Sequence, residues 1–326
     1  MINLAIVGYG NLGRGVVIAA SRNPDMQLVA VFTRRPDEIK KEIVDVPVFD
    51  SGEKAVITSD ISTDVVVLCG GSKEDTPIQG PLFVRKFNTV DSFDTHADIP
   101  GHFQRMDALA KEHGNVSIIS AGWDPGVFSV ERVVGDAFLS GSNRYTFWGP
   151  GVSQGHSDAA RKVRGVIDAR QYTIPIESAV EQIRQGKTPS FSKREMHKRV
   201  VYVVAQDTGE QERIKREIME MPNYYAEYDT QVIFISADEM RRRHSAYPHG
   251  GFVLTSGLTG KNSRQILEYK CQLDSNPEFT GSVLVACARA AYRLKQNGYK
   301  GAFTMLDIPP ALLSPHSGGT LRSSFI

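Results

Sequence analysis

The sequence predicts an α/β protein in which a Rossmann-type, doubly wound parallel sheet is joined to a second α+β domain. Three observations lead to this fold class. A glycine-rich turn joins the first apolar stretch to a helix-compatible stretch. Apolar stretches then alternate with helical ones up to about residue 120, which is typical of a parallel sheet. Beyond residue 122 the predicted strands outnumber the helices, which favours a mixed sheet with helices on one face.

The turn near the N-terminus predicts a dinucleotide-binding site. Residues 2–7 are apolar and rich in β-formers, and residues 14–21 are helix-compatible. Between them lie Gly8, Gly10 and Gly13 in the spacing G-x-G-x-x-G. In this motif the first glycine permits a tight turn, the second lets the backbone approach a pyrophosphate, and the third lets the helix pack on the strand. The N–H groups at the helix N-terminus then bind the phosphates.

The end of the second predicted strand indicates which cofactor binds. NAD-binding units carry an acidic residue there, about 20 residues after the glycines, that binds the ribose 2′-hydroxyl. After the strand predicted at 27–32, this chain has Thr33, Arg34 and Arg35 instead. A guanidinium can hold a 2′-phosphate through two parallel hydrogen bonds, whereas a carboxylate would repel it. The sequence therefore predicts NADP. The alternative is a solvated turn with two arginines, which the missing acid disfavours.

The first domain is predicted to hold five parallel strands. After the two already described, the expected elements are strands at 64–69, 88–93 and 116–120 and helices at 77–87 and 99–113. Gly70, Gly71 and Ser72 follow the third strand as a second glycine turn. Such turns lie at the carboxyl ends of parallel strands, where open α/β sheets bind ligands.

The second domain is expected to span residues 123–276, after a dinucleotide-binding domain at 1–122. Its predicted strands lie at 145–148, 166–175, 198–205, 228–236, 251–256 and 265–273, and its predicted helices at 127–139, 177–185 and 210–221. A last helix at 280–297 carries one apolar stripe, made of Val283, Cys287, Ala291 and Leu294. We expect this helix, with the rest of 277–326, to pack back on the first domain.

Composition and charge exclude several classes of protein. The 38 basic and 37 acidic side chains nearly balance, so neither a nucleic acid nor a membrane surface is an expected partner. The first strand begins at residue 2, which leaves no room for a signal peptide, and no apolar run approaches the ~18 residues of a membrane span. Cys69, Cys271 and Cys287 are far apart, as is typical of reduced thiols, so we expect a cytoplasmic protein. No set of residues has metal-ligand spacing.

Asp94 and Asp124 are the candidate catalytic residues. Each follows a predicted parallel strand, at the edge of the sheet that faces the nicotinamide half of a bound cofactor. Two carboxylates there can hold a substrate ammonium group or take a proton from it. A single aspartate in such a place is as often a turn cap, but two at matching positions favour a functional site.

A third glycine cluster lies at residues 149–156, directly after Trp148. It contains Gly151-Val-Ser-Gln-Gly155, formally the G-x-S-x-G pattern of serine hydrolases. That pattern needs a nucleophile elbow within an α/β-hydrolase sheet. Here a Gly-Pro-Gly segment precedes the serine, and a dinucleotide fold occupies the N-terminal domain. We therefore interpret the cluster as a loop that encloses substrate, with Trp148 as an apolar wall.

Two further side chains, Arg199 and His249, are candidates for binding substrate. Arg199 lies at the start of a predicted strand and can pair with a carboxylate bidentately, although an exposed strand-end charge is the alternative. His249 lies between Pro248 and two glycines, in a loop that can approach a ligand, although an isolated histidine is more often structural. The basic run at 241–244 is interpreted as a solvated helix face or a subunit contact.

Seven segments together resemble the meso-diaminopimelate D-dehydrogenase family. They are AIVGYGNLG at 5–13, VDSFDTH at 90–96, GWDPG at 122–126, TFWGPG at 146–151, SQGHSD at 153–158, YPHGG at 247–251 and DSNP at 274–277. Each segment is short, but their number and order are specific. The resemblance extends from about residue 2 to about residue 315, and the last ten residues carry no recognised motif.

The resemblance implies an NADP-dependent oxidative deamination. The D-configured end of meso-2,6-diaminopimelate loses a hydride to nicotinamide C4, and the resulting imine hydrolyses to L-2-amino-6-oxopimelate (tetrahydrodipicolinate) and ammonia. The reverse reaction is a reductive amination. The family works in lysine and cell-wall precursor biosynthesis, and it is usually a homodimer built through the second domain.

The same resemblance implies roles for individual residues. Asp94 and Asp124 hold the amine at the reacting centre. The other residues implied to bind substrate are Trp123 and Trp148 as pocket walls, Ser153, Gln154 and Gly155 as a closing loop with Asp158 behind it, and Thr173, Arg199, His249 and Asn276 at the distal L-end. The expected cofactor contacts are Gly8, Tyr9, Gly10, Asn11, Leu12, Gly13, Thr33, Arg34, Arg35, Cys69, Gly70, Gly71, Ser72, Ser92, Phe93, Asp94, Ala121, Gly122, Trp123, Asp124 and Pro125.

Three other functions stay open at this point. A semialdehyde dehydrogenase would need a nucleophilic cysteine in the substrate cleft, and the three cysteines lie in or beside predicted regular structure. A dihydrodipicolinate reductase would show a pair of histidines with a nearby lysine, which the sequence lacks. A non-catalytic NADP sensor would bind the nucleotide but would leave the candidate aspartates, arginine and histidine scattered over surfaces.

Overall fold

The computed structural model describes residues 1–58 and 60–326, and the chain forms two compact units. Unit 1 combines Met1–Val130 with Pro277–Ile326, and unit 2 is Glu131–Asn276. The first boundary lies later than the expected residue 122, because Val127 and Val130 still pack against the core of unit 1. None of the helices within the described residues is long and apolar enough to cross a membrane.

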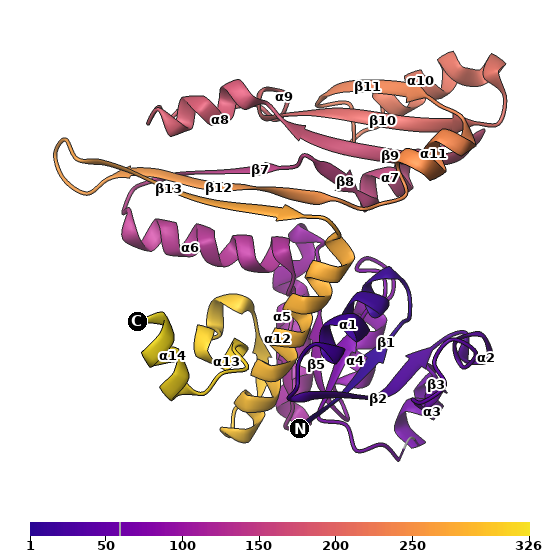
Figure 1. Cartoon of the computed structure of the whole chain (residues 1–326), viewed down its shortest axis with the longest axis vertical. Coiled ribbons are helices and arrows are strands. Elements are labelled where there is room, and N and C mark those ends of the chain that lie inside the picture. Colours follow the sequence, from indigo (N-terminus) through magenta and orange to yellow (C-terminus); the bar gives the residue numbers. More distant parts are fainter. Residues whose placement is uncertain (59) are drawn as a thin grey trace. The chain divides into compact units, whose positions relative to one another are not determined.

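Unit 1 is built on a parallel sheet of seven strands in the order β14-β6-β5-β4-β1-β2-β3. Figure 1 shows β1, β2, β3 and β5 of this sheet. Their bounds are β1 Ile2–Val7, β2 Met26–Thr33, β3 Val48–Asp50, β4 Val65–Leu68, β5 Asn88–Asp91, β6 Val116–Ile118 and β14 Gly301–Phe303. All neighbouring pairs run parallel, so the predicted Rossmann-type sheet is confirmed. The outer strands β3 and β14 were not predicted, because three residues are too few to show a periodic pattern.

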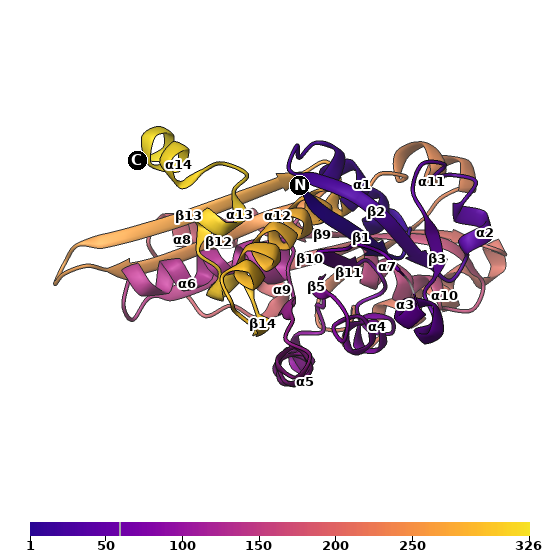
Figure 2. The same cartoon turned by 90° about the horizontal axis from the view of Figure 1, so that it is seen from below.

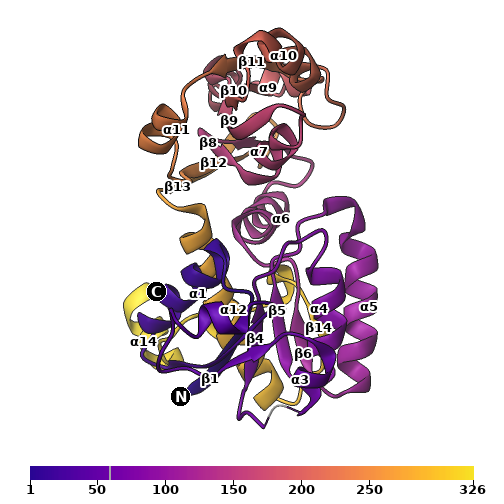
Figure 3. The same ribbon diagram turned by 90° about the vertical axis from the view of Figure 1, so that its right-hand side faces the viewer.

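Helices cover both faces of this sheet (Figure 3). Along β1, Leu4 and Ile6 pack into the core that holds α1 and α12, whereas Ala5 and Val7 face the core that holds Phe83 of α4. This alternation of apolar side chains is what a strand buried on both faces requires. The α-helices are α1 Asn11–Ser21, α2 Pro36–Ile39, α3 Glu53–Thr58, α4 Thr76–Phe83, α5 Ile99–Glu112, α12 Asn276–Gln296, α13 Pro310–Leu313 and α14 Gly318–Phe325, and the 3-10 or π-type turns are η1 His96–Asp98, η2 Trp123–Val127 and η4 Met305–Asp307.

Unit 2 is α+β as predicted, but it contains two sheets rather than one. A four-stranded sheet has the order β11-β10-β9-β8, and a three-stranded sheet has the order β13-β12-β7. The bounds are β7 Asn143–Trp148, β8 Gly151–Ser153, β9 Val166–Pro175, β10 His197–Ala205, β11 Asp229–Phe234, β12 His249–Leu258 and β13 Arg264–Leu273. The chain changes sheets between β7 and β8, where Pro150 has no N–H to continue a strand ladder. Figure 2 shows the long β12–β13 hairpin.

The helices of unit 2 pack on the two sheets separately. Ala160 of α7 and Ile214 of α10 share a core with Val201 of the four-stranded sheet. Val180 of α8 packs with Phe147 of the three-stranded sheet, and Figure 1 shows α6 along the other face of that sheet. The bounds are α6 Phe128–Phe138, α7 Gln154–Arg161, α8 Glu177–Arg184, α9 Lys193–Met196, η3 Thr208–Glu210, α10 Gln211–Met219 and α11 Ala237–Arg243.

Two predicted boundaries are wrong in ways that concern the site. The strand expected at 88–93 ends at Asp91, because the Asp91 side chain accepts the N–H of Phe93 at 3.0 Å and turns the chain. Residues 149–156, expected to be a loop, contain β8 and the start of α7. Short strands with glycine carry little signal in a sequence, so this one was hidden in the glycine cluster.

Candidate active site

In unit 1 a cavity of about 410 Å³ opens at the glycine turn. Predicted cofactor residues that line this cavity are Gly8, Tyr9, Gly10, Thr33, Arg34, Arg35, Cys69, Gly70 and Gly71. Three residues that were not predicted, Ser51, Asp75 and Gln79, also line it. The cavity therefore lies at the carboxyl ends of β1, β2 and β4, where an open α/β sheet binds its ligand.

The three motif glycines have the geometry that a bound pyrophosphate needs. Gly8 has a φ of +94°, which only glycine adopts readily. A Cβ on Gly13 would lie 2.2 Å from the carbonyl oxygen of Gly8, so any larger residue would separate helix from strand. A Cβ on Gly10 would meet no described atom within 4 Å. Since α1 begins directly after Gly10 and no described side chain caps it, its first N–H groups are available to phosphate.

Arg34 and Arg35 both line this cavity, but they have different partners. Arg34 Nη1 lies 3.1 Å from Asp75 Oδ1, and Asp75 Oδ2 accepts the N–H of Gly71 at 2.8 Å. Arg35 pairs with Glu38 at 2.8 Å. Asp75 thus connects Arg34 to the second glycine turn. No sequence pattern predicts this contact, because it joins positions that are distant in the chain.

Asp94 and Asp124 follow β5 and β6, which are neighbours in the sheet. Asp94 is exposed, and its N–H donates to Ser72 Oγ at 2.8 Å, which ties it to the second glycine turn. Asp124 is half-buried, and beside it Trp123 is buried with its ring edge-to-face to Phe128. The structure therefore brings both aspartates to the same edge of the sheet as the dinucleotide cavity.

In unit 2, Arg199 is buried, with 6% of its surface exposed. Its guanidinium lies 4.1 Å from the Tyr228 ring centroid and donates to Thr173 Oγ1. Its Nε has no hydrogen-bond partner among the residues that the structure describes, and no described carboxylate forms an ion pair with it. Burial lowers the pKa of Arg199, but an arginine keeps its charge at neutral pH. The alternative of an exposed strand-end charge is wrong, and the desolvated cation suits a carboxylate ligand.

Other predicted residues of unit 2 gather around the chain between β7 and β8. The N–H of Trp148 donates to His197 Nε2 at 2.9 Å. A Cβ on Gly149 would lie 2.1 Å from the carbonyl oxygen of Thr173, and a Cβ on Gly151 would lie 2.4 Å from His249 Cα. The two glycines therefore allow this chain segment to lie directly against Thr173 and His249, both of which are buried.

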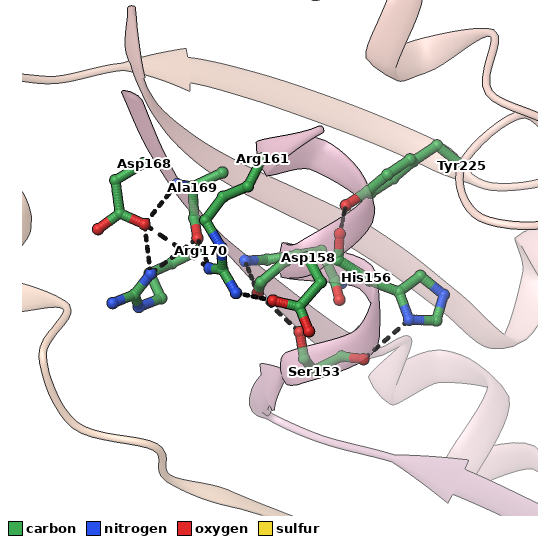
Figure 4. A network of polar contacts seen from close by, with 10 residues as sticks. Ser153, His156, Asp158, Arg161, Asp168, Ala169, Arg170 and Tyr225 are labelled. Carbon is green, nitrogen blue, oxygen red and sulfur yellow. Dashed lines mark hydrogen bonds and ion pairs between the residues drawn. The ribbon is translucent and has the colours of Figure 1, made fainter. Parts of the chain in front are cut away.

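The Ser153 segment is anchored through helix α7 (Figure 4). Ser153 Oγ lies 2.8 Å from His156 Nδ1, and the hydroxyl of Tyr225 donates to the carbonyl oxygen of His156 at 2.5 Å. Ser153 has an ordinary extended φ of −86°. A nucleophile elbow is strained at its serine, so the hydrolase alternative is wrong.

The remaining substrate-binding residues predicted in unit 2 are more exposed to solvent. Gln154 and Asn276 are half-buried and Gly155 is exposed. Asn276 donates its N–H to the carbonyl oxygen of Tyr247 at 3.0 Å, so it is tied to the segment that carries His249. Asp158 is exposed and forms an ion pair with Arg161, as Figure 4 shows.

The cysteines do not supply a nucleophile. Cys69, Cys271 and Cys287 are free and buried. Burial raises the pKa of all three thiols, that of Cys287 to about 12. Since the thiolate is the reactive form, the cysteine chemistry of a semialdehyde dehydrogenase is not supported.

Two histidines of unit 2, the half-buried His156 and the buried His197, should make stability depend on pH. Burial, together with the charge of Arg199, lowers the pKa of His156 to about 3 and that of His197 to about 4. In the unfolded chain both would titrate near 6.5. Between these values the unfolded state binds more protons, so the stabilisation is complete above about pH 6.5. It is lost as the pH falls, by up to about 1.4 kcal/mol per pH unit for each histidine.

Urea unfolding at pH 7.5 and 5.5 measures this effect. The difference in unfolding free energy between the two pH values should be about 1 kcal/mol smaller in His197→Gln than in the unchanged protein. Equal differences in both proteins would show that His197 is not held neutral by the fold.

Similarity to known proteins shows the family of this chain. A family model described as the diaminopimelic acid dehydrogenase C-terminal domain matches residues 122–275. The meso-diaminopimelate D-dehydrogenase of Lysinibacillus sphaericus is 53% identical over 325 residues, which cover 100% of this chain and 99% of that protein. The chain belongs to the diaminopimelate dehydrogenase family. The enzyme of the same name from Ureibacillus thermosphaericus is 52% identical with the same coverage.

Solved structures of two diaminopimelate dehydrogenases and of an engineered D-amino acid dehydrogenase share this fold. A sixfold mutant of the enzyme from Clostridium tetani E88, with DAP, has 45% identity, a TM-score of 0.92 and full coverage of both chains. C. glutamicum DAP dehydrogenase in complex with DAP also has 45% identity and a TM-score of 0.92, with coverage of 100% and 99%. An engineered D-amino acid dehydrogenase bound to NADP⁺ has 43% identity and a TM-score of 0.87, with coverage of 100% and 99%.

Proposed function

We infer that this protein is an NADP-dependent meso-diaminopimelate dehydrogenase. It removes the amino group of the D-centre of meso-2,6-diaminopimelate by oxidation, which yields L-2-amino-6-oxopimelate (tetrahydrodipicolinate) and ammonia, and it catalyses the reverse reductive amination. The observation that carries this inference is the 53% identity over the full chain to an enzyme of that name. The glycine cradle beside two arginines agrees with this chemistry, as does the buried Arg199, which has no anionic partner among the described residues.

The residues of unit 1 fit NADP as the cofactor. NADP, when bound, supplies the hydride acceptor of the oxidation. We propose that the N–H groups at the start of α1 hold its pyrophosphate and that Arg34 and Arg35 hold its 2′-phosphate. Both arginines line the cavity, and no acidic residue follows β2 where an NAD site would carry one.

The double variant Arg34→Ala/Arg35→Ala tests the assignment of the 2′-phosphate site. We expect its affinity for NADP⁺ to fall by about 100- to 1,000-fold, because charge-assisted hydrogen bonds contribute roughly 1.5–3 kcal/mol each. Its weak affinity for NAD⁺ should stay within about threefold. Titration calorimetry measures both, and Arg85→Ala, an exposed arginine paired with Glu53, is the control. An unchanged preference for NADP⁺ would remove both arginines from the site.

For the reacting end of the substrate, we propose that Asp94 and Asp124 hold the D-amino group. An ammonium group must lose a proton before its carbon can give up a hydride, and a carboxylate at hydrogen-bond distance can accept that proton. Both side chains follow neighbouring parallel strands, on the side of the sheet that carries the cofactor cavity, so the group they hold would lie beside a bound nicotinamide. Trp123, which is buried beside Asp124, would form an apolar wall.

For the distal L-end, we propose binding by unit 2. Arg199 would pair with the distal carboxylate, which supplies the anionic partner that its buried guanidinium lacks among the described residues. The six substitutions of the Clostridium tetani mutant fall at numbers where this chain has the same residue types. These are Gln154, Thr173, Arg199, Pro248, His249 and Asn276, all but one of them predicted here from the sequence. Fixing this distal end would decide which stereocentre reaches the cofactor, because remote binding energy sets orientation at the reacting carbon.

The proposal also includes an oligomeric state and a cellular location. We propose a homodimer built through unit 2, which rests on membership of the family. We also propose a cytoplasmic location, in keeping with the three free thiols. Size-exclusion chromatography with light scattering distinguishes a dimer from a monomer.

An absorbance assay at 340 nm tests the function. The protein is given meso-, L,L- and D,D-diaminopimelate in turn, each with NADP⁺ and with NAD⁺. We expect NADPH formation with the meso isomer, little with the L,L isomer, and little with NAD⁺. Tight NADPH binding without turnover of any isomer would contradict the dehydrogenase function and favour the NADP sensor.

A further inference from the structure

We propose that Asp91 is a positioning residue that holds the loops carrying Asp94 and Asp124 in their reactive arrangement. This role rests on the proposed function, in which those two aspartates hold the reacting amine. Asp91 does not reach the cofactor cavity or solvent, since only 1% of its surface is exposed. It acts through the backbone of the two loops.

One carboxylate oxygen of Asp91 accepts hydrogen bonds from both loops. Its Oδ1 accepts the N–H of Phe93 at 3.0 Å, in the loop after β5, and the N–H of Ser120 at 2.9 Å, in the loop after β6. Its main-chain oxygen accepts the N–H of Ala121 at 2.9 Å. Asp91 is therefore a common acceptor for the segments that lead directly to Asp94 and to Asp124.

The bonds from Asp91 connect the two chains beyond the last residue pair between β5 and β6. β5 and β6 pair Thr89 with Ser117 and Val90 with Ile118. Beyond this last pair the two chains diverge into their loops, and Asp91 connects them by its side chain and carbonyl. Ser120 has a φ of +53°, which a residue with a side chain rarely adopts. The bond from its N–H to Asp91 helps to hold this conformation at the start of the Asp124 loop.

His102 of helix α5 holds the second carboxylate oxygen of Asp91. Asp91 Oδ2 lies 2.9 Å from Nε2 of His102, and a carboxylate oxygen can only accept, so the ring nitrogen donates. His102 is 1% exposed, and its ring stacks on Phe93 with 4.3 Å between the ring centroids. The carboxylate cannot rotate without losing this bond, so Oδ1 stays directed at the two loop N–H groups.

The consequence is a specific effect on the chemical step. Displacing reacting groups by about 1 Å can cost roughly 100-fold in rate. Without Asp91, the Asp94 and Asp124 loops lose their shared acceptor, while the glycine turn after β1 keeps its own contacts. Loss of the Asp91 side chain should therefore lower kcat far more than it lowers cofactor affinity.

Three variants of Asp91 test this role in the full-length enzyme. Asp91→Asn keeps one acceptor oxygen for both N–H groups, so kcat should stay within about fivefold of the unchanged enzyme. Asp91→Leu has similar size but no acceptor, and kcat should fall by about 30- to 100-fold. Asp91→Ser can reach only the nearby Phe93 N–H, so it too should lose at least tenfold. The Kd for NADPH should remain within about threefold in all three.

Thr89→Val is the matched control. Thr89 Oγ1 donates to Ser117 Oγ at 2.9 Å in a buried contact between the same two strands, but it does not touch the loops. Its loss should lower the melting temperature and leave kcat unchanged. The proposal is wrong if Asp91→Leu keeps the kcat of Asp91→Asn and loses only thermal stability, as Thr89→Val does, because Asp91 would then be only a core residue. If Asp91→Leu does not fold, Asp91→Ser takes its place in this comparison. Failure of the proposed function itself would appear as an unchanged enzyme that does not turn over meso-diaminopimelate.

Discussion

Replacing Asp124 by asparagine is expected to lower kcat for meso-diaminopimelate by about 100- to 10,000-fold, the range typical of a lost general base. Asparagine fills the same space, but its amide cannot accept a proton from the substrate ammonium group. Asp124 is the stronger choice of the two aspartates, because it is half-buried beside the buried Trp123, whereas Asp94 is exposed. A less hydrated carboxylate interacts more strongly with an ammonium group.

Steady-state kinetics and NADPH titration together measure this effect. The Kd for NADPH should change by less than about threefold, because the amide preserves the size of the side chain. Asp98→Asn, which removes an exposed carboxylate in the same unit, is the control and should keep its full activity. A kcat of Asp124→Asn within about threefold of the control would exclude Asp124 as the residue that takes the proton.

Replacing Arg199 by methionine is expected to lower kcat/KM for meso-diaminopimelate by about 100- to 1,000-fold, while NADP⁺ affinity is unchanged. Removing one partner of a desolvated, hydrogen-bonded charge pair costs roughly 2–5 kcal/mol. The same change should raise the melting temperature, because the free protein no longer has to bury a guanidinium without an anionic partner among the described residues. Lower activity with greater stability is the combined result that a binding role predicts.

Arg194→Met is the control for this prediction, since Arg194 is exposed in the same unit. It should change neither kcat/KM nor the melting temperature appreciably. If Arg199→Met unfolds more readily and binds substrate normally, Arg199 is a structural residue of the four-stranded sheet.

Much of unit 1 could be predicted because its signals are local. A buried strand is a continuous apolar run. Gly8, Gly10 and Gly13 are each required for a different steric reason within one turn. The strands that were missed, β3 and β14, are stabilised by neighbours in the sheet rather than by a pattern of their own. Their existence follows from tertiary pairing, which no window of the sequence contains.

The sequence predicted the residue types of the candidate site but not the burial and contacts of those residues. Arg199 was visible as a cation at a strand start. Its burial depends on β9, whose Thr173 lies opposite it in the ladder 26 residues away in sequence. Asp91 and His102 gave no signal at all, because a buried hydrogen bond between a strand end and a helix face has no sequence spacing of its own. The division of unit 2 into two sheets was missed for the same reason, since it depends on which strands pair after Pro150.

Following a single hydrogen atom tests whether the protein oxidises the D-centre of meso-diaminopimelate. meso-Diaminopimelate is prepared with deuterium on the carbon of the D-centre alone, and separately on the carbon of the L-centre alone. Each is incubated with the protein and NADP⁺, and the reduced cofactor is analysed by mass spectrometry. We expect deuterium at nicotinamide C4 from the first substrate and none from the second. Deuterium transferred from the L-centre, or unlabelled NADPH from both substrates, would contradict this expectation.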